Sequence, residues 1–215
     1  MVNGIVFLGG EGPPPERCRA LAEEARTPEG TEPLLAAADS GLLLAERADL
    51  RPRWIIGDMD SLGPEGEKLL ALQPPERVLK YPPGKDHTDA ELALFLLWEK
   101  GCTSVWLAGG GGGRTDHLMA IRSLFERDRP PDRWLTAAED IRCLEAPSEL
   151  ALSIRGPLSV FPLGEGPWEA ESTGLRWPLA GLPWEKGFFG LSNEAPGGIC
   201  LIRALRGRFL VIFRY

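Results

Sequence analysis

The sequence predicts an α/β domain with a mainly parallel sheet over residues 1–146, followed by an all-β domain over residues 147–215. In the first part, short apolar runs alternate with segments of helical character, and this alternation implies right-handed crossovers and a parallel sheet. After Ala146-Pro147 the pattern changes to short apolar runs separated by turns, with no convincing helix. A chain of 215 residues is long enough for these two domains.

The expected elements follow the chain in order. In the first domain we expect strands at 4–8, 34–38, 54–56, 78–81, 104–108 and 134–137. Helices should lie between them, at about 15–25, after Gly41, and at 66–72, 89–100 and 114–127. In the second domain we expect strands at 150–154, 158–162, 199–205 and 209–213. The last two flank Arg206-Gly207-Arg208, which we interpret as a hairpin turn.

Composition limits the classes of protein that the chain can represent. The apolar fraction of 43% can support a packed core. The net charge of −7 argues against binding to nucleic acid or to an anionic membrane, although backbone amides and a metal ion can still bind a nucleotide's phosphates. There is no bilayer-length apolar run and no evident signal peptide, so a cytoplasmic location is expected. The cysteines are widely spaced and are expected to be reduced: Cys18, Cys102, Cys143 and Cys200.

Asp58 and Asp60 follow the expected strand 54–56 and are separated by one residue. Gly57 lets the backbone turn where that strand ends. Two carboxylates this close repel each other, and a bound divalent cation removes the repulsion. Mg²⁺ is usually held by one or two carboxylates together with substrate phosphates. An aspartate-rich turn without a metal is the alternative interpretation of an isolated Asp-x-Asp.

Further polar residues follow other expected strands. In open parallel sheets the ligand lies beyond the carboxyl ends of the strands, so these residues should share one site. A lone Lys85-Asp86 pair is more often a solvated surface contact, but beside a triphosphate the lysine would neutralise phosphate charge. The complete set is Asp39, Asp58, Asp60, Lys85, Asp86, Asp89, Arg114 and Asp116.

A run of five glycines, Gly109 to Gly113, precedes Arg114 and an expected helix. Such a run lets backbone amides approach phosphate, and Gly112, Gly113 and Arg114 are the candidate contacts. It matches neither the Walker motif nor Gly-x-Gly-x-x-Gly, and a plain flexible loop is the alternative. The histidines, His87 and His117, do not form a compact zinc set, and the acidic cluster suits a hard cation better.

In the second domain, Trp177, Ser192 and Asn193 are the candidate ligand-binding residues. The indole could stack on a flat ring, although a core position is the better interpretation of a single tryptophan. The hydroxyl and the amide could orient a small polar ligand, and turn formation is their alternative role.

Taken together, these motifs resemble the thiamine pyrophosphokinase (thiamine diphosphokinase) family. Each motif is weak alone, but the ordered set spans nearly the whole chain. The motifs that carry the resemblance are Ala38-Asp39-Ser40-Gly41, Gly57-Asp58-Met59-Asp60-Ser61, Lys85-Asp86-His87-Thr88-Asp89-Ala90-Glu91, Gly112-Gly113-Arg114-Thr115-Asp116-His117, Gly174-Leu175-Arg176-Trp177-Pro178-Leu179 and Ser192-Asn193-Glu194.

The resemblance implies a Rossmann-like nucleotide-binding domain, a C-terminal β-sandwich, and a homodimer with thiamine bound between subunits. It implies transfer of the pyrophosphoryl group of ATP to the hydroxyl of thiamine, with release of AMP. Asp58, Asp60 and Asp86 would hold Mg²⁺. Lys85 and Arg114 would bind the phosphates, with Asp39, Asp89, Gly112, Gly113 and Asp116 around the nucleotide. Thiamine would contact Thr173, Trp177, Ser192 and Asn193.

The sequence departs from the family pattern at three positions. The family often has glycine at the position of Ser40 and phenylalanine at the position of Met59. It often has an asparagine at the position of Ile121, after the Asp-His pair of the expected helix. Two other functions remain open at this point: the same transfer to another alcohol such as a hydroxymethyl-pterin, and a nucleotide- or thiamine-binding module without catalysis. A zinc hydrolase fits the residues least well.

Overall fold

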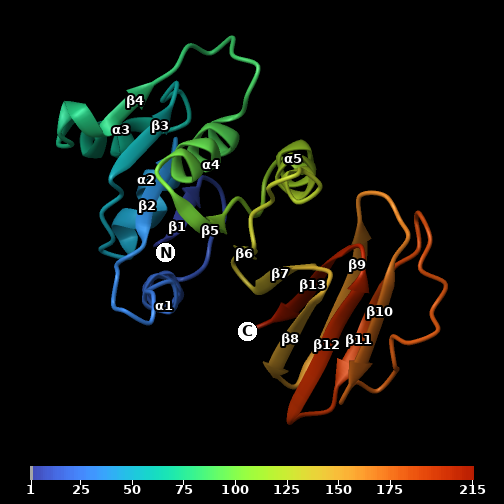
Figure 1. The fold of residues 1–215 in the computed structure, drawn as a ribbon. Coiled ribbons are helices and arrows are strands. Elements are labelled where there is room, and N and C mark those ends of the chain that lie inside the picture. Colours follow the sequence, from blue (N-terminus) through green and yellow to red (C-terminus); the bar gives the residue numbers. More distant parts are fainter. Residues whose placement is uncertain (1) are drawn as a thin grey trace. The chain divides into compact units, whose positions relative to one another are not determined.

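The computed structural model describes residues 2–215, and the chain divides into two compact units (Figure 1). The first unit contains residues 2–124 and 134–137, and the second contains residues 125–133 and 138–215. The expected boundary at 146–147 therefore falls inside the second unit. The strand before it, Glu139–Glu145, pairs with the last strand of the chain, and this pairing assigns it to the second unit.

The first unit is built on a parallel sheet, and its strands have the order β5-β1-β2-β3-β4, with β6 beside β5. Most of these strands are apolar runs buried on both faces, which is typical of a parallel sheet. The strands are β1 (Val2–Leu8), β2 (Leu34–Ala38), β3 (Trp54–Gly57), β4 (Val78–Lys80), β5 (Cys102–Gly109) and β6 (Arg133–Leu135).

Helices occupy the connections between these strands (Figure 1). Each expected helix is present, with ends that differ by a few residues from the predicted ones. The helices are α1 (Pro15–Glu24), α2 (Gly41–Arg47), α3 (Gly63–Ala71), the 3₁₀-helix η1 (Pro75–Arg77), α4 (Asp89–Glu99) and α5 (Thr115–Leu124).

The side chains of β1 show how the sheet is covered on both faces. Ile5 and Phe7 belong to a core cluster that includes residues of α1 and α2. Gly4, which points to the opposite face, lies so close to α4 that a Cβ there would be 2.8 Å from Leu97 Cδ1. The first unit is therefore a three-layer α/β structure, as the alternating pattern predicted.

The second unit contains two antiparallel sheets. One has the strand order β11-β9-β13-β7, and the other has the order β10-β12-β8. A single buried cluster draws residues from both sheets, so the two sheets form a sandwich. The strands are β7 (Glu139–Glu145), β8 (Ser148–Ser153), β9 (Gly156–Leu163), β10 (Glu169–Thr173), β11 (Gly190–Ala195), β12 (Ile199–Arg206) and β13 (Arg208–Arg214).

The expected hairpin at Arg206-Gly207-Arg208 is wrong. β12 pairs with β8 and β10, whereas β13 pairs with β7 and β9, so Gly207 carries the chain from one sheet to the other. The connection at Ala146 also changes sheets, and the Ala146 amide donates a hydrogen bond to the Gly207 carbonyl at 3.0 Å. Both crossings occur because each flanking strand buries its apolar face in the shared core.

None of the helices formed by residues 2–215 is both long and apolar enough to span a membrane.

Candidate functional site

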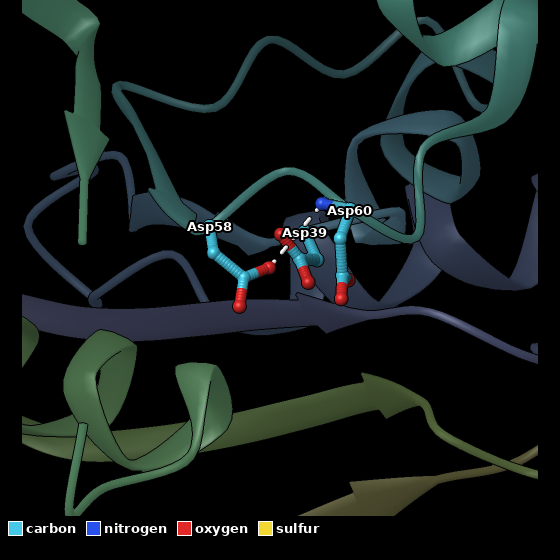
Figure 2. A group of neighbouring side chains, drawn as sticks. All are labelled: Asp39, Asp58 and Asp60. Atoms are coloured by element: carbon cyan, nitrogen blue, oxygen red, sulfur yellow. Dashed lines mark hydrogen bonds between the residues drawn. The ribbon is translucent and has the colours of Figure 1, made fainter. Parts of the chain in front are cut away.

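The carboxylates of Asp39, Asp58 and Asp60 converge at the carboxyl ends of β2 and β3 (Figure 2). One oxygen from each residue lies within 4.8 Å of the corresponding oxygens of the other two. Three carboxylate oxygens at this separation match the donor set that a hard divalent cation prefers. We refer to these three residues as the aspartate cluster.

Hydrogen bonds hold the cluster together in spite of a strained backbone. Asp39 and Met59 both have positive φ angles, 48° and 70°, a conformation that costs energy outside glycine. The Met59 amide donates to Asp39 Oδ1 at 2.9 Å, and the Asp60 amide donates to Asp58 Oδ1 at 3.2 Å. The Ser61 hydroxyl lies 3.3 Å from Asp39 Oδ2. The loop after β3 is therefore tied to the end of β2.

Gly57 is required at the end of β3 because two carboxylates crowd it. A Cβ at this position would lie 2.1 Å from Asp39 Oδ1 and 3.2 Å from Asp89 Cγ. No real Cβ tolerates the first distance without moving its neighbour. The same contacts show that Asp89, at the start of α4, lies next to Asp39.

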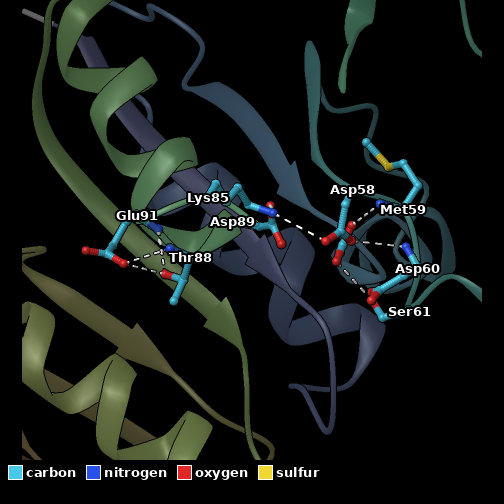
Figure 3. Close-up of polar contacts among 9 residues, drawn as sticks. Asp58, Met59, Asp60, Ser61, Lys85, Thr88, Asp89 and Glu91 are labelled. Carbon is cyan, nitrogen blue, oxygen red and sulfur yellow. Dashed lines mark hydrogen bonds and ion pairs between the residues drawn. The ribbon is translucent and has the colours of Figure 1, made fainter. Parts of the chain in front are cut away.

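Lys85 is the cation of the site (Figure 3). Its Nζ lies 3.4 Å from Asp58 Oδ2 and 3.0 Å from Asp89 Oδ1. The contact with Asp89 lacks hydrogen-bond alignment, so that buried oxygen accepts no hydrogen bond from residues 2–215. The lysine thus joins the loop after β3 to the first residue of α4.

α4 begins with a capping box that fixes the position of Asp89. The Glu91 amide donates to Thr88 Oγ1 at 3.3 Å, and the Thr88 amide donates to Glu91 Oε2 at 2.8 Å (Figure 3). Thr88 is the N-cap residue of this helix. Because Lys85 and Asp89 flank the cap, the capped turn orients both of them.

The electrostatics of the site differ between its carboxylates. Burial, followed by the negative charge of Asp89, raises the pKa of Asp39 to about 6. The amide of Asp60 and the charge of Lys85 lower the pKa of Asp58. Desolvation works against the charge of Lys85, but Asp89 and Asp58 outweigh it and raise its pKa. The lysine therefore stays charged, and Asp58 stays ionised.

The other predicted residues of the first unit lie on exposed surface. Asp86 is exposed on the loop before α4 and lies outside the aspartate cluster. Arg114 Nε donates to Asp116 Oδ1 at 3.1 Å, and these two exposed residues form an ion pair at the start of α5. The Asp116 charge is thus already compensated by Arg114, whose pKa is raised by that hydrogen bond.

The first glycines of the run are packed against neighbouring residues, whereas the last one is exposed. A Cβ at Gly109 would lie 2.4 Å from the Leu8 carbonyl oxygen, and one at Gly110 would lie 2.5 Å from Ile121 Cδ1. Ile121 therefore fills the space beneath the run. A Cβ at Gly113 would meet nothing within 4 Å, so its backbone is accessible.

In the second unit, Trp177 is 51% exposed and is not a core residue. Asn193 is buried, and its amide group spans the loop: Oδ1 accepts from the Trp177 amide at 3.2 Å, and Nδ2 donates to the Trp177 carbonyl at 2.6 Å. The Arg176 guanidinium lies over the indole, 4.8 Å from its centroid. Thr173 and Ser192 are exposed near the same loop.

Sequence reasoning did not assign roles to Ser61, Glu11 or Glu91. Ser61 links Asp39 to Ser40, 3.1 Å away, and Glu11 pairs by its backbone with Gly111 inside the glycine run. Only Glu91 had a readable signal, because a threonine followed three residues later by glutamate is the pattern of a capping box. The contacts of Ser61 and Glu11 depend on segments that are distant in sequence.

The comparisons with known proteins agree on one family. The sequence model described as thiamin pyrophosphokinase, catalytic domain, matches residues 30–130. This segment contains the aspartate cluster, Lys85, Asp89 and the glycine run, whereas Trp177 and Asn193 lie outside it.

Solved structures share the fold over the whole chain. Thiamin pyrophosphokinase from Geobacillus thermodenitrificans is 24% identical with a TM-score of 0.75, and the match covers 100% of this chain and 98% of that one. The Bacillus subtilis enzyme is 22% identical with a TM-score of 0.75, covering 100% and 99%. The Candida albicans enzyme is 16% identical with a TM-score of 0.69, covering 98% and 88%.

At these identities the solved structures establish the fold alone, and the match to the catalytic-domain model carries the assignment. The predicted resemblance is thereby confirmed. Residues 30–130 of this chain therefore match the catalytic domain of the thiamine pyrophosphokinases, a family of ATP-dependent diphosphotransferases.

Proposed function

We propose that this protein transfers the pyrophosphoryl group of ATP to the hydroxyl of thiamine, giving thiamine diphosphate and AMP, and that the aspartate cluster with Lys85 is the centre of this reaction. The observation that carries the proposal is the convergence of Asp39, Asp58 and Asp60 within 4.8 Å, beside a charged lysine, inside the segment matched by the family model. Simple binding of a nucleotide does not require so many carboxylates beside a phosphate.

Asp58 and Asp60 are the proposed ligands of Mg²⁺, with Asp39 completing the set. Their oxygens fit a hard cation by chemistry and by separation. Asp86, exposed on the loop before α4, remains a predicted ligand of the same ion. When bound, Mg²⁺ would neutralise charge on the phosphates as the bond to AMP breaks.

The remaining residues would bind and align the substrates. Lys85 and Arg114 would contact phosphate oxygens, and Asp116 would orient the Arg114 guanidinium through their ion pair. The amides of Gly112 and Gly113 would approach the phosphates ahead of α5, while Asp89 would hold Lys85. Because phosphoryl-type transfers depend mainly on positioning and charge, these contacts would supply most of the catalysis.

Thiamine would stack on the exposed indole of Trp177, whose backbone amide and carbonyl are both hydrogen-bonded to the side-chain amide of Asn193. Thr173 and Ser192 would contact its polar groups. Asn193 would therefore act mainly as a positioning residue, because its amide is already engaged with the backbone of Trp177.

A homodimer is the proposed assembly. Large apolar side chains are exposed on the second unit, and a second copy of the chain would cover them: Trp177, Phe189, Leu191 and Ile199.

Release of AMP from ATP, measured with and without thiamine, tests the function. The wild-type protein should release AMP only when thiamine and Mg²⁺ are both present. If AMP were released with a hydroxymethyl-pterin and not with thiamine, the acceptor of the pyrophosphoryl group would be the pterin alcohol. Binding of both substrates without AMP over hours would show a module without catalysis.

Asp58→Asn tests the metal site. This variant should lose at least about 100-fold in kcat, because it removes one charge from the cluster while leaving its shape unchanged. Asp49→Asn is the matched control: Asp49 is an exposed aspartate of the same unit with a φ of 55°, which asparagine tolerates. Full activity of Asp58→Asn would rule out the proposed role of the cluster.

A further inference from the structure

We propose that the first unit carries a second anion-binding site, at the end of the sheet opposite the aspartate cluster, and that it recognises a diphosphate group. The site is an open cleft of about 730 Å³. It is lined by Leu34, Arg51, Arg53, Trp54, Glu76, Arg77 and Lys100. This inference does not depend on the proposed reaction. We refer to the cleft as the basic cleft.

The strand directions place the basic cleft away from the aspartate cluster. Leu34 and Trp54 are the first residues of β2 and β3, whereas Asp39 and Asp58 directly follow the last residues of these strands. The two strands are parallel, so the basic cleft lies at their amino ends. Five residues of β2 span roughly 16 Å at the usual rise of a strand. A single phosphate group cannot occupy both sites.

The charge of the basic cleft is unusual for this protein. Four basic residues and one acidic residue, Glu76, line it, in a chain whose net charge is −7. Lys100 Nζ lies 3.9 Å from Glu99 Oε1, whereas Arg51, Arg53 and Arg77 form no side-chain hydrogen bond or ion pair with any part of the chain between residues 2 and 215. Arg26, by contrast, forms ion pairs with Glu23 and Glu32. The guanidinium groups of the cleft therefore retain their full capacity to bind an anion.

Two of the basic side chains, Arg53 and Lys100, lie close to the aromatic ring of Trp54. The Arg53 guanidinium carbon lies 5.1 Å from the centroid of that ring, and Lys100 Nζ lies 6.0 Å from it. The negative face of an aromatic ring attracts cations, which offsets part of their mutual repulsion. The ring thus serves as a platform that keeps positive charge concentrated before any ligand arrives.

These features select the ligand class. Several guanidinium groups around one small cleft match an anion with more than one charge and several oxygens, and guanidinium pairs bind phosphate oxygens in a forked manner. Nucleic acid is disfavoured by the acidic net charge of the whole chain. A diphosphate group meets the requirement, whether it is free pyrophosphate or part of a nucleotide.

Isothermal titration of the full chain in EDTA, with inorganic pyrophosphate and separately with ADP, tests the inference. EDTA removes divalent ions, so the aspartate cluster repels both probes. Binding of both probes would show that the diphosphate group alone is recognised, and binding of ADP alone would identify a nucleotide as its source. Absence of binding by either probe at millimolar concentration would overturn the proposal.

Charge reversal then locates the bound anion. Arg77→Glu and, independently, Arg51→Glu should weaken binding about 10-fold or more, because each removes a charge-assisted contact and adds repulsion. Arg206→Glu makes the same change of net charge at an exposed position of the second unit and should change the dissociation constant less than twofold. Thermal melts would verify that each variant folds. Equal effects of all three variants, or weakening only by Lys85→Gln, would contradict the basic cleft as the site.

Discussion

At the scale of single residues, the burial of Asp39 and the charge of its neighbour Asp89 both affect its pKa. Its carboxyl is partly buried between the ends of two strands and lies beside Asp89, and both effects raise its pKa to about 6. The same carboxyl accepts the hydrogen bond of the Met59 amide that shapes the loop after β3. An ionised Asp39 is therefore unfavourable for folding unless a cation compensates it.

The sign of the resulting pH dependence follows from the direction of the shift. Because the pKa in the folded state lies above the ordinary value of 3.8, the stability contributed by protonated Asp39 is fully present below about pH 4 and is lost as the pH rises through about 6. Without divalent ions, Asp39→Asn should raise the free energy of unfolding by about 1 kcal/mol at pH 7.5, after allowance for solvent screening. The gain should disappear at pH 4.

Urea denaturation at a series of pH values measures this difference. Asp49→Asn, at an exposed position, should show no such trend. A gain in the Asp39 variant that increased as the pH fell would contradict the raised pKa.

Asn193 gives a second prediction at this scale. Asn193→Ala removes both hydrogen bonds that hold the backbone of Trp177, so the indole loses its fixed position. The KM for thiamine should rise about 10-fold, as expected for loss of well-placed buried hydrogen bonds, while the KM for ATP stays within twofold. Steady-state kinetics with each substrate varied in turn measures both constants. Equal increases would indicate general damage to the fold.

The sequence predicted part of the candidate site at this scale. Asp39, Asp58, Asp60, Lys85 and Asp89 could be grouped because each follows a strand, and their closeness is a consequence of parallel strand order. The link between Asn193 and Trp177 could not be predicted, because it joins positions 16 residues apart through an irregular loop.

At the scale of elements, the start of α2 has no room for a side chain at residue 41. A Cβ at Gly41 would lie 2.0 Å from the Phe7 carbonyl oxygen and 2.9 Å from the Leu8 amide nitrogen. Both atoms belong to the central strand β1, which cannot move aside. α2 and β1 can approach this closely only because residue 41 has no side chain.

Gly41→Ala should therefore lower the free energy of unfolding by about 2 kcal/mol or more, because the clash is with backbone. Gly84→Ala is its matched control, since a Cβ there meets nothing within 4 Å and the φ angle is not in the left-handed region. Chemical denaturation of both variants measures the difference. If the two variants were equally stable, α2 would be able to shift away from β1.

The strands of the two units were not equally predictable. β1, β2 and β3 are short apolar runs because helices cover both faces of their sheet. β7 was missed because a buried aspartate interrupts its apolar pattern: Asp140 accepts hydrogen bonds from Arg133 at 2.9 Å and from Arg142 at 2.8 Å. β11 was missed because its register with β9 is irregular between Gly190 and Asn193, so no alternation marks it.

At the scale of the whole molecule, the proposed dimer gives a further prediction. Leu191 and Ile199 are 61% and 72% exposed. If a second copy covers them, Leu191→Glu and Ile199→Glu should each shift the protein from dimer to monomer, because each places a charge in an apolar contact. Sedimentation velocity at several concentrations measures the change. Leu72→Glu, at an 80% exposed leucine of the first unit, is the control and should leave the assembly unchanged.

The overall class of fold was readable from the sequence, but the path of the chain through the second unit was not. Alternating strands and helices specify a parallel sheet almost by themselves, because crossovers have one hand. A turn of arginine and glycine between two apolar runs is equally compatible with a hairpin and with a crossing between sheets. Packing of both strands against the shared core decides between them at Gly207, and that packing is a property of the assembled sandwich.

The position of the Lys85 ammonium group affects the binding of a divalent cation and of a phosphate at this site. In the ligand-free chain it is the counter-charge that lets Asp58 and Asp89 stay near each other. A divalent ion that neutralises Asp58 frees the ammonium group from that carboxylate, while Asp89 still holds it. Entry of the cation and capture of the phosphate should therefore reinforce each other, because the Lys85 side chain exchanges Asp58 for a phosphate oxygen.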